Sequence, residues 1–350
     1  MRILTYLGTL ALLVCSSTSL SALDKIDEQL LTFAQSQPPR EGLNIPALAK
    51  LLRERVPDDF KAAELAFYWI TEHIVYDFNA EKINTEQIDL EKVLQTRRGN
   101  VQTFSQLYQE LCQQMGLSCH LITGYVNDLM YVSDAEGRVE EELDGSLRDI
   151  PDRPYHSWNM VKIGDVYYAI DVIFGLGAVD GGADGDFFVK KYDLTQILVQ
   201  EGNFFITHLP ADPRWQMRER PISLHTYHLN IPFSEMESTH QSDAPYDYQA
   251  AITTFEAATD AEQRLMTLRA IHAYNASNFN LRQYADALYN MGYTQSLGDY
   301  DTQRLLSARK YYEQAIAMYK KVEDSPVVEQ LMAQAEQGIT YVAYRLDAKR

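Results

Sequence analysis

Residues 97–117 read RRGNVQTFSQLYQELCQQMGL, and this stretch decides how the first two thirds of the chain fold. Its apolar residues recur at helical spacing from about Val101 to Met115, which predicts an amphipathic helix. Gly99 marks a turn before this helix. Gly116 suits the position just after a helix end, because glycine adopts positive φ without strain.

Helices precede this stretch and strands follow it. Upstream, residues 58–80 carry apolar side chains at helical spacing, with Asp58 or Asp59 as the candidate N-cap. Downstream, Gly, Pro and Asp separate four β-rich segments: SCHLITGYV at 118–126, YHSWNMVKI at 155–163, VYYAIDVIF at 166–174 and a less regular NFFITHL at 203–209. The order predicts an α+β fold over residues 56–235, in which N-terminal helices pack on an antiparallel sheet.

The N-terminus predicts export. Residues 1–22 combine Arg2, an apolar run and small residues, which is typical of a signal peptide, so we expect a periplasmic or secreted protein. A membrane anchor is the alternative, but the run is too short to span about 30 Å of bilayer. Lipoprotein anchoring through Cys15 is less favoured because Val14 precedes it. Residues 23–55 read as a helical lead-in.

A polar linker at 236–248 precedes a helical region at 249–350. Within it, ALYNMGYTQ at 287–295 and SARKYYEQAIAMYKK at 307–321 show the small and aromatic spacing of tetratricopeptide (TPR) repeats. The interval from Gly292 to Gly338 exceeds one repeat of about 34 residues, so the repeat is irregular. We predict an all-α, TPR-like domain here, and an ordinary three- or four-helix appendage is the alternative.

Composition excludes some partners. The formal net charge of −18 and the pI near 4.8 argue against nucleic acid and anionic lipid, which bind through Lys and Arg. After removal of a signal peptide, only Cys112 and Cys119 would remain. An oxidising compartment permits a disulfide between them, but two separately buried thiols are the favoured expectation.

The segment from 155 to 174 predicts a hairpin that carries chemistry. Gly164-Asp165 suits a two-residue turn, which pairs Ile163 with Val166 and, counting outward, Trp158 with Asp171. Because alternate residues share a face, His156, Trp158 and Asp171 project from one side of the sheet. A carboxylate there can hold one imidazole nitrogen and leave the other at a cleft.

Four blocks in order resemble the transglutaminase-like superfamily, in its kyphoscoliosis-peptidase-like branch, which has a papain-like cysteine-peptidase fold. They are FYWITEHIVYD, the stretch from 93 to 126, YHSWNMVKIGDVYYAIDVIFGLGA and FFITHLPADPRWQMRERPISL, and the resemblance spans roughly residues 25–232. In this family, the residue two places after the glycine of the arginine-glycine turn is the nucleophilic Cys. The match places that Cys on Val101, and places the catalytic His and Asp on His156 and Asp171.

The resemblance therefore implies a remnant catalytic pair without a thiol. Valine has no lone pair, so a covalent thioester is excluded at this position. Ser105 lies one helical turn, about 6 Å, deeper than Val101, and Cys112 lies about 16 Å deeper. Thr103 is rotated by roughly 200°. None of these residues stands where the nucleophile would attack.

We expect a catalytically inactive module that binds or scaffolds a protein, a peptide or cell-envelope material, through a cleft at Asn100, Gln102 and Trp158 and through the helical tail. No cofactor or transmembrane segment is expected. The alternative is an amide hydrolase that uses Ser105 or a water activated by His156. A purely structural subunit is a third class, because a fold does not fix function.

A calcium site is not expected either. Asp180, Asp184 and Asp186 lie in a Gly-rich loop, but compared with an EF-hand loop the third and twelfth ligand positions fall on Gly182 and Lys191. The sequence therefore predicts a solvated turn and no metal.

Overall fold

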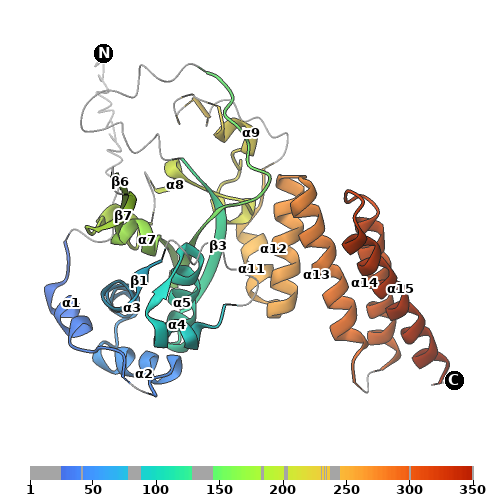
Figure 1. Cartoon of the computed structure of the whole chain (residues 1–350), viewed down its shortest axis with the longest axis horizontal. Helices are drawn as coiled ribbons and strands as arrows, with labels where there is room; N and C mark the ends of the chain where they lie inside the picture. The colour runs from blue at the N-terminus through green and yellow to red at the C-terminus, as the bar shows by residue number, and fades with distance from the viewer. Residues whose placement is uncertain are drawn as a thin grey trace, which may run out of the picture.

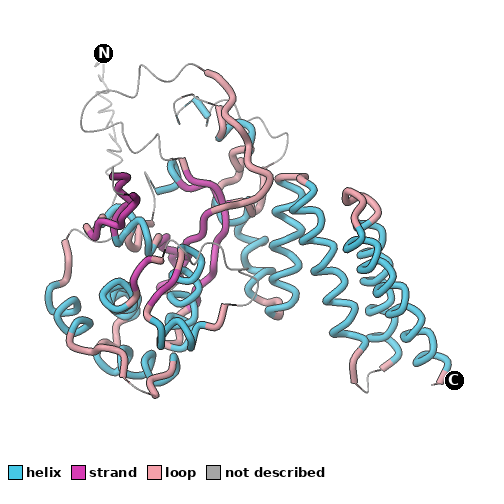
Figure 2. Tube along the Cα trace, in the orientation of Figure 1, coloured by secondary structure: helices cyan, strands magenta, loops and turns pink. Residues whose placement is uncertain are grey.

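The computed structural model describes residues 25–40, 42–77, 88–127, 145–182, 185–200, 204–229, 231, 233, 235–236, 245–298 and 301–348. Helices and a curled antiparallel sheet form the first part, and the last part is helical (Figures 1 and 2). This confirms the predicted α+β fold followed by an all-α region. The predicted signal peptide, residues 1–22, lies outside the described residues. Among the described helices, none combines the length and apolarity needed to cross a bilayer.

The lead-in and the first core helix are α1 (Glu28–Gln35), α2 (Ile45–Arg55) and α3 (Asp59–His73). Each begins at a polar side chain, Asp27, Asn44 or Asp58, whose oxygen accepts hydrogen bonds from backbone N–H groups of the first turn. Every residue of α3 from Ala62 to Thr71 is buried, so this helix is surrounded by other elements.

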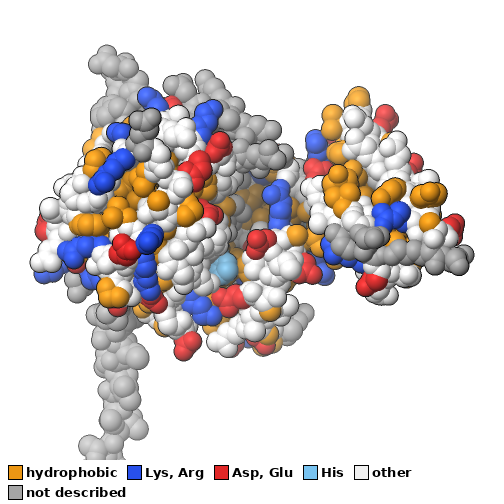
Figure 3. Space-filling view, turned by 90° about the horizontal axis from the view of Figure 1, so that it is seen from below, with side chains coloured by type: hydrophobic (Ala, Val, Ile, Leu, Met, Phe, Trp, Pro, Cys, Tyr) orange, Lys and Arg blue, Asp and Glu red, His pale blue; other side chains and the backbone are white. Residues whose placement is uncertain are grey.

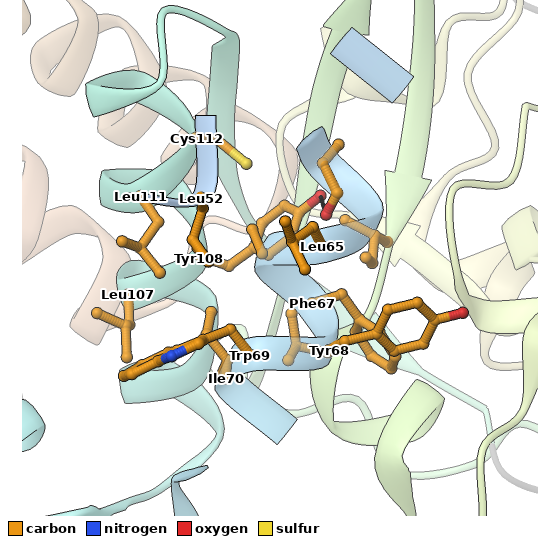
Figure 4. Packing of buried hydrophobic residues seen from close by; sticks show 14 of the residues in the cluster. Leu52, Leu65, Phe67, Tyr68, Trp69, Ile70, Leu107, Tyr108, Leu111 and Cys112 are labelled. Carbon is orange, nitrogen blue, oxygen red and sulfur yellow. Dashed lines mark hydrogen bonds between the residues drawn. The ribbon is translucent and has the colours of Figure 1, made fainter. Parts of the chain in front are cut away.

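The stretch that decides the fold forms the predicted turn and helix. Strand β1 (Val75–Tyr76) pairs in parallel with β2 (Arg98–Gly99), which follows α4 (Leu90–Thr96) and leads into α5 (Val101–Gln114). Gly116 follows the end of α5 at φ 85°, as its position in the sequence predicts. Figure 4 shows Leu107 and Tyr108 of α5 turned toward α3, where Trp69 lies against them. This contact forms the main hydrophobic core.

The sheet has the strand order β5-β4-β3-β8. Its strands are β3 (Ser118–Val126), β4 (His156–Ile163), β5 (Val166–Ile170) and β8 (His208–Pro210), and every neighbouring pair is antiparallel. Ile163 pairs with Val166, so the predicted turn and register of the β4–β5 hairpin are confirmed. β8 pairs with β3, which precedes it by about 80 residues.

Two predicted strands are shorter than expected. Residues Val172–Leu176 form helix α7, because the Asp171 side chain accepts hydrogen bonds from the N–H groups of Ile173 and Phe174 and so starts a helix. The segment 203–209 contains helix α8 (Phe204–Thr207), and only its last residues belong to β8. Both segments were expected to be strands because short apolar runs have no decisive period.

Shorter elements connect the sheet to the C-terminal helices. They are β6 (Gly177–Gly182), β7 (Gly185–Lys190), η3 (Leu194–Gln196), η4 (Pro213–Gln216) and α9 (Leu224–Tyr227). β6 and β7 form a separate antiparallel pair. Asp184 lies outside the described residues, as do the side chains of Asp180 and Asp186, so the solvated-turn interpretation stays a prediction.

The first C-terminal helix packs on the sheet. Ile252 and Phe255 of α11 (Tyr248–Glu256) join Trp215 in a hydrophobic cluster on the face opposite α5. On the same helix, Glu256 accepts hydrogen bonds from Lys162 at 3.1 Å and from Tyr167 at 2.5 Å. The predicted boundary at 236–248 stays a prediction, and the helix after it shares a core with the sheet.

The remaining helices are α12 (Asp260–Tyr274), α13 (Asn278–Ser296), α14 (Thr302–Tyr319) and α15 (Pro326–Asp347), which follow one another away from the sheet (Figure 1). Tyr312 of α14 lies between two glycines of the neighbouring helices. A Cβ atom added to Gly292 would stand 2.9 Å from its ring, and one added to Gly338 would stand 2.4 Å from it. The TPR-like assignment stays a prediction.

Replacing Gly338 by Ala should destabilise the C-terminal helices by a net of about 1–2 kcal/mol. Alanine gains about 1 kcal/mol of helix propensity over glycine. However, its Cβ atom would meet the Tyr312 ring, and overpacking of this kind costs about 1–3 kcal/mol. Urea unfolding measures the difference, and Gln337→Ala at the neighbouring exposed position is the control. Equal stability of the two variants would show that Tyr312 moves aside freely.

The two cysteines are free, buried thiols and form no disulfide with each other, which agrees with the favoured expectation. Cys112 near the end of α5 and Cys119 on β3 are both buried and contact each other. Burial raises the pKa of the Cys119 thiol, and the contact with Cys112 adds to this shift.

Candidate functional site

The N-terminus of α5 is held in place by its own residues. Val101 is the first helical residue, and Asn100 is the N-cap. The Oδ1 atom of Asn100 accepts hydrogen bonds from the backbone N–H of Thr103 at 3.0 Å and from its hydroxyl at 2.9 Å. A Cβ atom at Gly99 would stand 2.6 Å from the Thr103 methyl group, so the turn before the helix needs glycine. The nucleophile position is therefore a well-fixed helix start that carries a valine.

Two serines link this helix start to strand β4. The Ser105 hydroxyl lies 3.2 Å from the carbonyl oxygen of Val101 and 2.9 Å from that of Ser157, to which it donates. The Asn159 side-chain amide donates to the Ser105 carbonyl at 3.0 Å. Because Ser157 directly follows His156, these bonds hold the start of α5 beside the start of β4. Ser105 itself is buried and its hydroxyl is engaged, so it is not presented as a nucleophile.

His156 and Asp171 meet as the hairpin register predicts. The Nε2 atom of His156 hydrogen-bonds to Oδ2 of Asp171, and both side chains are buried. A carboxylate only accepts, so Nε2 carries the proton and the Nδ1 atom of a neutral ring is then an acceptor. No partner for Nδ1 is found within the described part of the chain. The pair thus retains the orientation that a general base requires.

Asp171 is held as an anion. Its Oδ1 atom accepts from the N–H groups of Ile173 and Phe174, each at 2.9 Å. Burial alone would raise the pKa of Asp171, but the charge and hydrogen bond of His156, and then those of His208, outweigh burial and lower the pKa far below its usual value.

His208 is a third member of this cluster that the sequence interpretation missed. It begins β8, its Nε2 atom lies 3.2 Å from Oδ2 of Asp171, and its side chain is fully buried. Its ring stacks on Phe204 at 4.0 Å between centroids. Burial lowers the pKa of His208, and Asp171 opposes this shift, so the ring is neutral near pH 7. Local spacing gives no signal for this contact, because it depends on β8 pairing with β3.

Trp158 corrects an expectation about the cleft. Its side chain is fully buried, with its ring 5.0 Å from that of His208 in an edge-to-face arrangement. It fills the space beside Gly124 on β3, where a Cβ atom would stand 2.5 Å from the indole. Trp158 is therefore a core residue on the same side of the sheet as His156 and does not line an open cleft. Asn100 is also buried, whereas Gln102 is partly exposed.

The two histidines and the aspartate form the kind of group that could ligate a metal ion. Their nearest nitrogen and oxygen atoms all lie within 4.8 Å of one another. A tetrahedral zinc ion with bonds of about 2.0–2.1 Å separates its ligand atoms by about 3.3 Å. His156 and Asp171 are in direct hydrogen-bond contact, closer than that separation. The arrangement fits a hydrogen-bonded cluster better than an ion site.

The buried histidines predict a loss of stability in mild acid. Burial lowers the pKa of His208 and His228 below 6.5, so the unfolded chain binds protons more readily than the folded one. Their contribution to stability is therefore complete above about pH 6.5 and is lost as the pH falls below it, by at most about 1.4 kcal/mol per pH unit for each residue. Urea unfolding at pH 7.5 and 5.5 measures the slope, which His228→Phe should reduce. An unchanged free energy of unfolding would contradict the prediction.

Part of the chain is similar to known proteins. Residues 46–172 match the family model of the transglutaminase-like superfamily. The chain is 23% identical over 205 residues to kyphoscoliosis peptidase of Homo sapiens, which is 58% of this chain and 28% of that protein. It is 24% identical over 197 residues to hillarin of Drosophila melanogaster, which is 53% of this chain and 22% of that protein.

A solved structure described as a TGase covers 43% of this chain and 34% of its own, at 11% identity and a TM-score of 0.26. The chain spans less than a third of the length of the curated relatives it matches.

Proposed function

We propose that residues 46–172, which match the model of the transglutaminase-like superfamily, bind a peptide or protein segment in this chain without cleaving or cross-linking it. The observation that carries the proposal is Val101 at the first position of α5, where a thiol would have to stand. Without that thiol, no acyl-enzyme forms. Ser105 is buried and engaged, and Cys112 is buried further along the helix, which supports the absence of a substitute.

The remaining groups are suited to recognition of a peptide. The first turn of any α-helix has backbone N–H groups without an intrahelical partner, which can donate to a carbonyl oxygen. In α5, the Asn100 side chain accepts from one of these groups, the Thr103 N–H. The Nδ1 atom of His156 offers an acceptor on the neighbouring strand. Donors on one side and an acceptor on the other complement the C=O and N–H of a peptide group.

The surface supports a partner of mixed polarity. The face in Figure 3 carries Lys and Arg side chains interspersed with Asp and Glu, together with apolar side chains on the C-terminal helices. Exposed apolar residues on these helices include Tyr293, Leu297, Leu306, Tyr341 and Tyr344. We propose that the helical region binds the same partner or a second one, and that the whole protein acts in the cell envelope after export. Mass spectrometry that locates the N-terminal residue of the mature protein tests whether a signal peptide is removed on export.

A peptide-display selection tests the binding function. Wild-type protein should enrich related peptides, and Val101→Arg, which puts a larger charged side chain at the start of α5, should weaken their binding at least about tenfold. Lys50→Ala, at an exposed position of α2, should leave it unchanged. An amide-hydrolysis assay runs beside it. Hydrolysis that survives alkylation of both thiols and disappears in His156→Ala would overturn the proposal in favour of a hydrolase. Failure to enrich any peptide would overturn it in favour of a structural subunit.

A further inference from the structure

Asp171 receives hydrogen bonds from two imidazoles, although a catalytic pair of this kind needs one. His156 and His208 both direct Nε2 at Oδ2 of Asp171, while Oδ1 accepts from two backbone N–H groups of α7. The carboxylate is thus held at both oxygens by three separate segments of the chain. Such a carboxylate cannot rotate without losing several bonds at once.

The surroundings of His208 fix which of its nitrogens carries the proton. Its Nδ1 atom lies 2.8 Å from the Thr207 hydroxyl and 3.1 Å from the carbonyl oxygen of Phe204. If Thr207 donates to Nδ1, then Nε2 carries the proton and donates to Asp171. If Nδ1 were protonated instead, the lone pair of Nε2 would face a carboxylate oxygen. The Asp171 carboxylate, which only accepts, therefore favours the tautomer with the proton on Nε2. In that tautomer Nδ1 can accept from the Thr207 hydroxyl, which also lies 3.1 Å from the Phe204 carbonyl oxygen as a donor.

Packing holds the His208 ring in this position. Phe204 stacks on one face, and Trp158 presents an edge at 5.0 Å between centroids. β8 pairs with β3 through Tyr125 and Leu209, which fixes the backbone of His208 on the strand next to β3, while His156 lies on β4 at the other side of β3. Because packing fixes His208, its hydrogen bond also restricts where the Asp171 carboxylate can lie.

We infer that His208 is a positioning residue, which holds Asp171 so that Asp171 in turn orients His156 and leaves the Nδ1 atom of His156 as the acceptor. The role of His208 rests on the proposed function in one respect: the proposed peptide ligand would contact His156 in the orientation that Asp171 gives it. The chemistry of His208 is a hydrogen bond from Nε2, so a side chain that restores this donor restores the effect.

The test uses the Val101→Cys variant and the rate at which its introduced thiol reacts with iodoacetamide from pH 5 to 9, read by peptide mass spectrometry. Adding His208→Phe retains the stacking and removes the donor. It should raise the midpoint of the pH profile by about one unit, which is roughly a tenfold lower rate on the acidic side. Adding His208→Gln supplies an amide N–H in place of Nε2 and should return the rate to within about twofold.

Two further variants separate positioning from folding. Thr207→Val removes only the hydroxyl beside Nδ1 of His208, so it should raise the midpoint in the same direction without an altered core volume. His228→Phe replaces another buried histidine, whose Nδ1 bonds to the Leu224 carbonyl, and should leave the midpoint unchanged. In the otherwise wild-type protein, ¹⁵N NMR should show His156 protonated at Nε2, with this preference weakened in His208→Phe and kept in His208→Gln.

Equal midpoints for His208→Phe, His208→Gln and the parent would overturn the inference and leave His208 a packing residue. A midpoint raised equally by Phe and Gln would also overturn it, because the donor would then be irrelevant. If His208→Phe fails to fold, the midpoint of the pH profile of Thr207→Val tests the inference by itself. Alkylation uses no peptide, so peptide binding can fail while this inference stands, and the inference can fail while peptide binding stands.

Discussion

Replacing Val101 by Cys is expected to create a thiol that forms roughly 30-fold more thiolate at pH 7 than an unperturbed cysteine and therefore reacts with iodoacetamide several-fold faster, since a thiolate of lower pKa is a weaker nucleophile. An ordinary thiol, with a pKa near 8.5, is only a few per cent ionised there. A helix N-terminus and a neighbouring imidazole both stabilise a thiolate, and together they bring thiol pKa values to about 6 or below. The Ser105–Ser157 hydrogen bond joins the first part of α5 to the strand that carries His156.

Three controls locate the source of the reactivity. Gln102→Cys shares the helix terminus but points about 100° away around the helix, so it reports the effect of the helix without His156. Adding His156→Ala to Val101→Cys removes the imidazole. Cys112 and Cys119 are buried and should react slowly in every variant. If folded Val101→Cys reacts no faster than Gln102→Cys, the His156–Asp171 pair no longer faces the nucleophile position, and the search for function moves to the C-terminal helices.

Replacing Gly124 by Ala is expected to destabilise the domain by about 3 kcal/mol. The added Cβ atom would stand 2.2 Å from the carbonyl oxygen of Leu209 on β8 and 2.5 Å from the Trp158 indole. One of these contacts is backbone, so relief requires β8 to move, at the upper end of the 1–3 kcal/mol that overpacking usually costs. Since β8 carries His208, the same change should also slow the alkylation of the introduced thiol in the Val101→Cys background.

Urea unfolding measures the first effect, and Thr123→Ala is the matched control one residue earlier on β3. That substitution removes atoms from a partly buried position and should cost below about 1 kcal/mol. A Gly124→Ala protein as stable as the control would show that β3 and β8 separate easily. In that case the alkylation rate of the Val101→Cys thiol should also be unchanged, and the packing argument for the position of His208 would be wrong.

The local features of the site could be predicted from the sequence. Helical spacing and Gly116 predict α5 and its end, and the Gly164-Asp165 turn predicts the β4–β5 register, because periodicity and turn geometry act over a few residues. That register brings Asp171 to His156. The same reasoning failed at 172–174 and 204–207, where short apolar segments formed helices; at 172–174 the cause is a polar side chain that caps the helix.

The residues alone thus determined the α+β class, the hairpin and the absence of a thiol at Val101. Only the tertiary structure decided that Trp158 is buried, that α11 shares the core of the sheet and that His208 contacts Asp171. Each of these depends on segments about 35 or more residues apart packing together. Local periodicity cannot predict such a contact, because the contact forms only when β8 pairs with β3 and α11 packs on the sheet.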